Sequence, residues 1–362
     1  MESLPREILA AEVLLRCAEY GPAVRSVCRL WRGLAAGMPR RLKGKGLLFL
    51  AEENCGALLD WVRSLRKWFV RIQVGRIAFG AARGGHLALC LKAKEEWGVA
   101  SDVPDSVNLM LCGAAQGGHL AICEAAKEWG ATDYGGMLRG AALVGHHAIC
   151  EAAKEWGATN WDEMLRIAAL GGHHALCLLA KEWGATNWDE MLCGAAQGGH
   201  HALCLLAKEW GATDWNEMLA SAAENGHRAL CLLAKEWGAT DWNEMLIAAA
   251  SGDHVALCLL AKEWGATDWN WMLYHAARYG HLAACTVAKE WGAIGWNGML
   301  VDAAGGGHLD VCLLAKKWGA TDWNGMLNVA EYGLHVDIRL KAKEWGATSE
   351  WSADSLQRAG VV

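Results

Sequence analysis

The sequence has no long hydrophobic run, and its opening residues lack the pattern of a secretory signal. No stretch approaches the ~18–20 uninterrupted apolar residues that a membrane span requires. The first residues, MESLPREI, carry acidic and basic side chains where a signal peptide has an apolar run. We therefore expect a soluble, cytoplasmic protein that contacts no membrane.

The sequence also lacks an excess of positive charge. It holds 34 Lys and Arg against 40 Asp and Glu, which gives a net charge of −6. This balance argues against a nucleic-acid-binding protein. Only residues 38–76 are locally basic. A charge run of this kind is more typical of a solvated face than of a phosphate-binding site.

Candidate catalytic residues are equally scarce. No Ser-His-Asp set, phosphate-binding loop or isolated carboxylate pair stands out from the rest of the sequence. We expect no catalytic residue and no cofactor, and therefore no enzyme.

The sequence contains instead a repeated phrase of 27 residues. The segment 171–210, GGHHALCLLAKEWGATNWDEMLCGAAQGGHHALCLLAKEW, contains it almost twice. Ten turns of the Gly-His type mark ten copies; their histidines are His86, His119, His146, His173, His200, His227, His254, His281, His308 and His335. Each copy is too small to bury an apolar face alone, so the copies are expected to stack.

The pattern inside one copy predicts two helices. In residues 214–240, Asp214 and Glu217 have the spacing of a capping box at a helix start. The Asn-Gly pair at 225–226 ends that helix, and a second helix is predicted over 228–237. The second helix carries one apolar stripe, formed by Leu230, Leu233, Ala234 and Trp237.

Cysteine follows the same period, recurring every 27 residues from Cys123 to Cys312. Equivalent positions in stacked helical repeats lie about 10 Å apart, whereas a disulfide needs Cα atoms within about 7 Å. We expect reduced, buried thiols that act as small apolar residues, which fits an intracellular location.

Histidine and cysteine recur four residues apart, as in His146 and Cys150, which puts two potential metal ligands on one helix face. A zinc site needs four converging ligands, yet this pair is repeated uniformly along the chain. We expect no metal site, and we interpret the histidines as partners for backbone groups at the start of the second helix.

Tryptophan forms two rows. The row that closes the second helices is interpreted as packing; it comprises Trp129, Trp156, Trp183, Trp210, Trp237, Trp264, Trp291, Trp318 and Trp345. The row that opens the first helices comprises Tyr134, Trp161, Trp188, Trp215, Trp242, Trp269, Trp296 and Trp323. This second row either stacks within the array or faces a ligand.

The shared letters AAxxGHxxLCLLAKxWGA resemble the ankyrin repeat, LHLAAxxGHxxIVxLLLxxGA. The resemblance covers residues 78–348 and implies an all-α solenoid of about ten helix–turn–helix units. The family's unit has about 33 residues, and the residues missing here are those of its projecting hairpin, so we expect short loops. We assign 38–77 to a basic linker with a degenerate capping repeat and 349–362 to a C-terminal tail. The short, Trp-rich units look like arrays encoded by large DNA viruses of amoebae, which would place the protein in the host cytoplasm.

Residues 1–37 do not copy the repeat. Their letters resemble an F-box, which opens Leu-Pro-x-Glu-Ile-Leu and closes Val-Cys-x-x-Trp. The resemblance implies binding to the small adaptor subunit of a cullin-RING ubiquitin ligase. The residues assigned to that contact are Leu4, Pro5, Ile8, Leu9, Val13, Val27 and Trp31. Between the two ends the family has a run of leucines where this chain has RCAEYGPAVRS. The alternative is a plain N-terminal cap for the array.

The copies differ most at the two positions after Met-Leu and the two after Ala-Ala. In an ankyrin-like fold these positions line the concave face of the array. The eighth copy, NWMLYHAARYGH, is the richest in the aromatic and Arg residues that dominate binding hot spots. Its candidate target-binding residues are Trp271, Tyr274, His275, Arg278 and Tyr279. The alternative is drift at unconstrained positions.

These resemblances together imply a substrate-recognition adaptor of a cullin-RING ligase. We expect a monomer that holds the ligase through residues 1–37 and an unidentified target protein through the repeats. A scaffold or decoy that binds a host protein without any ligase is the alternative.

Overall fold

A computed structural model describes residues 67–95 and 104–348, and every regular element in these ranges is an α-helix. The chain divides into two compact units, Met1–Thr186 and Asn187–Val362. The assignments to 1–37 and 349–362 lie outside the described residues. Within the described ranges, no helix combines the length and the apolar character needed to cross a bilayer.

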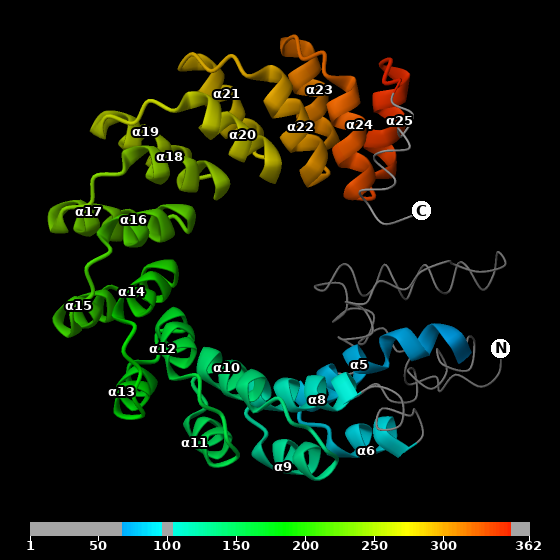
Figure 1. Ribbon diagram of the computed structural model, residues 1–362, viewed down its shortest axis with the longest axis vertical. Helices are drawn as coiled ribbons and strands as arrows, with labels where there is room; N and C mark the ends of the chain where they lie inside the picture. Colours follow the sequence, from blue (N-terminus) through cyan, green and yellow to red (C-terminus); the bar gives the residue numbers. More distant parts are fainter. Residues whose placement is uncertain (1–66, 96–103, 349–362) are drawn as a thin grey trace, which may run out of the picture. The chain divides into compact units, whose positions relative to one another are not determined.

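The described part of the first unit contains four helix pairs (Figure 1). They are α5 (Lys67–Arg83) with α6 (Leu87–Glu95), α8 (Pro104–Gly117) with α9 (Leu120–Glu128), α10 (Tyr134–Val144) with α11 (His147–Glu155), and α12 (Trp161–Leu170) with α13 (His174–Glu182). The expected repeat boundary at residue 78 falls inside α5, so the first helix of this copy begins eleven residues earlier, at Lys67.

The described part of the second unit contains six further pairs. They are α14 (Trp188–Gln197) with α15 (His201–Trp210), α16 (Trp215–Glu224) with α17 (Arg228–Trp237), α18 (Trp242–Ser251) with α19 (Val255–Trp264), α20 (Trp269–Tyr279) with α21 (Leu282–Glu290), α22 (Trp296–Gly306) with α23 (Leu309–Trp318), and α24 (Trp323–Tyr332) with α25 (Val336–Glu344). The two units together hold ten pairs across 67–348, as the ten histidine turns predict.

First helices carry most of the stacking between copies. Within each unit, a first helix packs on the second helix of its own copy and on the first helix of the next, as α16 does on α17 and α18. Small side chains allow this close approach, since Ala222 and Ala223 are fully buried beside Met218 and Leu219. A helical-repeat architecture is therefore established for the described residues.

The helix ends follow the local sequence. The Oδ1 atom of Asp214 accepts a hydrogen bond from the backbone N–H of Glu217 (3.0 Å), which caps α16 as expected. Gly238 ends α17 in the left-handed conformation, with φ 108°. The reciprocal half of the predicted capping box is wrong, however. The backbone N–H of Asp214 donates to Asp189 of the preceding copy (2.9 Å), so a neighbouring repeat supplies that acceptor.

The predicted apolar stripe on the second helix needs a similar correction. Leu230, Cys231 and Ala234 are buried, whereas Leu233 and Trp237 are only half-buried. The reason is that the first helix of the same copy covers the Cys231 side of α17, while Trp237 lies at the end of the helix beside the loop.

Candidate functional site

One polar contact joins successive copies through their loops. The Oδ1 atom of Asn216 accepts hydrogen bonds from the backbone N–H groups of Thr240 (2.8 Å) and Asp241 (3.0 Å) in the next copy. The same acceptor position is filled by Asn108, Asp162, Asp189, Asn243, Asn270, Asn297 and Asn324. These side chains therefore hold the loop between one copy and the next.

The repeated histidines also join neighbouring copies. The Nε2 atom of His281 lies 2.9 Å from the carbonyl oxygen of Ser251, thirty residues earlier, and His227 makes the same contact with Gln197 at 3.1 Å. This carbonyl lies near the end of a first helix, where it lacks an intrahelical partner. The histidines do contact backbone groups, but the predicted place was wrong: His227 and His281 make no side-chain cap at their own second helix, and their partners are carbonyls at the end of the preceding copy's first helix. In the described residues, no three His, Cys, Asp or Glu side chains come together as a metal site.

The two tryptophan rows meet in pairs. The rings of Trp215 and Trp237 lie 5.1 Å apart, edge to face. The Nζ atom of Lys208, from the preceding copy, lies 4.2 Å from the ring of Trp237 and 5.6 Å from that of Trp215. Equivalent ring pairs recur from Trp161 to Trp345. The tryptophans that open the first helices therefore pack against those that close the second helices, and a lysine of the preceding copy lies beside each such pair from Trp215 onward.

The periodic cysteines are free thiols, as expected. Cys123, Cys231 and their equivalents are fully buried. Removal from water raises the pKa of each of these thiols to about 12, because burial disfavours the thiolate. These thiols are therefore unsuited to nucleophilic chemistry near neutral pH.

The predicted target-binding residues gather on α20 and at its end. Trp271 and Tyr279 expose 55% and 51% of their surface, and Arg278 is exposed as well. The ring of Trp271 lies 5.8 Å from Tyr274 and 6.3 Å from His275. Tyr279 is set apart from these rings and stacks on His281 at 6.3 Å. The structure therefore presents an aromatic and cationic surface at this copy.

Two of the five predicted residues also have packing roles. A Cβ atom added at Gly295 or Gly298 would lie within 2.5 Å of Tyr274, so the tyrosine ring fills space that these glycines leave in the next copy. The Nδ1 atom of His275 lies 3.3 Å from the hydroxyl of Ser251. The accessible part of the surface is thus Trp271, Arg278 and Tyr279, which we call the α20 patch.

An acidic side chain borders the α20 patch. Asp302 of α22 is half-buried, and burial raises its pKa, while the charges of Arg278 and His275 act in the opposite direction. The patch therefore combines two exposed rings with a cation, Arg278, whose charge acts on a half-buried carboxylate.

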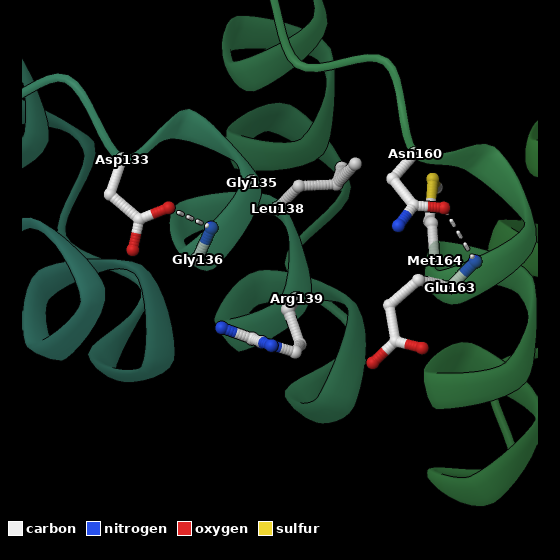
Figure 2. Close-up of a pocket in the computed structure, with 8 residues that line it drawn as sticks. All are labelled: Asp133, Gly135, Gly136, Leu138, Arg139, Asn160, Glu163 and Met164. Carbon is white, nitrogen blue, oxygen red and sulfur yellow. Dashed lines mark hydrogen bonds between the residues drawn. The ribbon is translucent and has the colours of Figure 1, made fainter.

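A second feature, absent from the sequence-based predictions, is a pocket of about 200 Å³ between α10 and α12 (Figure 2). Asp133, Gly135, Gly136, Leu138 and Arg139 line it from the first of these copies, and Asn160, Glu163 and Met164 line it from the next. The signal was available in the letters DYGGML, which stand where the next four copies have NWDEML or DWNEML. Gly135 lacks the Asn or Asp side chain that other copies carry at this position, and the space in front of it is open.

Opposite charges surround the pocket. Arg166 donates to both carboxylate oxygens of Glu163, at 3.0 and 3.2 Å, and this contact lowers the pKa of Glu163. Asp133 accepts from the backbone N–H of Gly136 at 2.8 Å. Both acidic groups at the pocket therefore already have partners.

The residues assigned to the ligase adaptor, from Leu4 to Trp31, lie outside the described residues, so their arrangement stays a prediction. In comparisons with known proteins, no family model matches the sequence, and no curated protein matches it.

Proposed function

We propose that this chain is a protein-interaction module that captures a target protein through the α20 patch. The main support for this proposal is that Trp271, Arg278 and Tyr279 are exposed together on one copy of a repetitive array. Exposed Trp, Tyr and Arg side chains are the types that contribute most to binding hot spots. The other copies provide a reference, since those from 136 to 325 carry Glu or Gly at the position of Trp271, and none of these carries a cation at the position of Arg278 or an aromatic ring at that of Tyr279.

We further propose that residues 1–37 couple this module to a cullin-RING ubiquitin ligase, which makes the whole chain a substrate-recognition adaptor. The support is the F-box-like spacing from Leu4 to Trp31. Apolar residues on a short helical segment that cannot fold alone are suited to docking on a partner. The free, buried thiols of the array favour a reducing compartment, and we place the protein in the cytoplasm.

Target capture is tested with a pair of matched double variants. Arg278→Ala with Tyr279→Ala removes two members of the α20 patch without disturbing Tyr274. Leu143→Ala with Val144→Ala changes the equivalent positions of α10, which are 40% and 46% exposed. We expect proteins captured from the native host to be lost with the first variant and kept with the second. Capture lost only with the α10 variant would place the target site there and contradict the proposal.

Ligase coupling is tested by mixing the purified chain with the adaptor subunit. Co-elution that disappears in the double variant Leu9→Ala with Trp31→Ala supports the proposal. Absence of a complex at micromolar concentration would leave a scaffold or decoy that acts without a ligase.

A further inference from the structure

The pocket between α10 and α12 exists because one connecting side chain is missing. At eight described junctions, an Asn or Asp side chain reaches the loop of the next copy, as Asn216 does to Thr240. Gly135 occupies this position in α10. A Cβ atom there would have one neighbour within 4 Å, the Oδ1 atom of Asp133 at 3.7 Å, so the space in front of Gly135 is open.

The missing side chain leaves two hydrogen-bond donors without a protein acceptor. The backbone N–H groups of Thr159 and Asn160 correspond to those of Thr240 and Asp241 in the later copy. Within the described ranges, neither finds an acceptor in the protein, whereas their counterparts both donate to Asn216. The neighbouring copies thus show directly which chemical group belongs at this position, namely a planar carboxylate or amide.

The side chains around the opening add further donors. Asn160 uses its Oδ1 atom to cap α12, which turns its amide nitrogen toward the space in front of α10 (Figure 2). Arg139 lines the pocket and, among the described residues, forms no ion pair or hydrogen bond. The acidic residues Asp133 and Glu163 have partners of their own. The groups at this site without a hydrogen-bond acceptor in the described protein are therefore all donors, and the charge of Arg139 acts only at longer range on Glu163.

We propose that this pocket binds a carboxylate of a partner polypeptide. The carboxylate takes the place of the missing Asn or Asp side chain and accepts hydrogen bonds from the amides of Thr159 and Asn160, while Arg139 supplies the opposing charge. A volume of 200 Å³ admits a group the size of a side chain. Sites for drug-sized ligands usually occupy about 300–1,000 Å³, so this pocket is smaller than such a site. The carboxylate comes from an acidic side chain or from a free C-terminus.

Three short peptides distinguish these sources in amide ¹⁵N NMR titrations of the full chain. N-acetyl-Ala-Glu-Ala-amide carries a side-chain carboxylate, N-acetyl-Ala-Ala-Ala carries a terminal one, and N-acetyl-Ala-Gln-Ala-amide carries none. We expect the Thr159 and Asn160 signals to shift with one or both acids and to stay unchanged with the neutral peptide. Equal shifts with all three peptides, or no shift at millimolar concentration, would overturn the proposal. A response to inorganic phosphate alone would also overturn it.

Two variants at one position test the mechanism. Gly135→Asn restores the internal acceptor and should weaken peptide binding by at least about tenfold, because the two amides then have a partner. Gly135→Ala adds a methyl group to open space without an acceptor, and it should bind like the native chain. Arg139→Gln should weaken binding and reduce its dependence on salt. Identical affinities for Gly135→Asn and Gly135→Ala would show that the amides do not hold the ligand.

Discussion

The paired tryptophan rows allow a quantitative prediction about stability. Replacing a fully buried Trp by Ala costs about 3–5 kcal/mol. Trp237 is half-buried, so we expect Trp237→Ala to lower the free energy of unfolding by about 2–3 kcal/mol, less than full burial would imply. About 0.5–1.5 kcal/mol of this loss belongs to the edge-to-face pair with Trp215. A further amount of about 0.5–1 kcal/mol belongs to the contact with Lys208.

The assay must report on the altered copy, because repeat arrays can unfold in parts. Urea unfolding followed by circular dichroism gives the total change, and hydrogen exchange in α16 and α17 gives the local one. Trp271→Ala is the matched control, since Trp271 is 55% exposed and should lose less than about 1 kcal/mol. A double-mutant cycle with Lys208→Met isolates the cation–π term.

Equal losses for the two tryptophans would refute this reasoning. A coupling energy near zero between Lys208 and Trp237 would also refute it, because the lysine would then be solvated and would not stabilise the tryptophan pair.

Three further predictions follow from the contacts between copies. Cys231 and its equivalents have pKa values raised to about 12, above the ordinary value of about 8.5, so their stabilising contribution is complete below pH about 8.5 and is lost as pH rises toward 12. Urea midpoints should therefore fall from pH about 9 to 11, and alanine at several of these positions should flatten the trend. His227→Ala should cost about 1 kcal/mol in urea unfolding through its lost contact with Gln197, while exposed His201→Ala should cost less than about 0.5 kcal/mol. Asn243→Gly should destabilise the array by about 1–2 kcal/mol, because the loop amides of the next copy lose their acceptor. Gly135→Asn should stabilise the array by about 1 kcal/mol, because it supplies such an acceptor. Changes of the opposite sign in thermal unfolding would contradict the role of this side chain in joining the copies.

Local structure was predictable because each copy repeats the same local signals. The pattern around Asp214 and the break at 225–226 predicted α16 and α17, and the structure confirms both. The buried cysteines were predictable as well, since a fixed spacing in a helical repeat puts every copy in the same environment. The adaptor-binding assignment from Leu4 to Trp31 stays a prediction.

The contacts between copies needed the tertiary structure. The atoms that meet belong to residues 24 to 30 positions apart, and the sequence alone does not show which backbone group each side chain reaches. Tyr274 looked like a pure surface residue until Gly295 and Gly298 were found beneath its ring. The sequence alone did not single out Gly135, yet it opens a pocket, because the hydrogen bond that it cannot make joins two copies. Local sequence determined the helices of each copy, and packing between copies decided which side chains remain available to a partner.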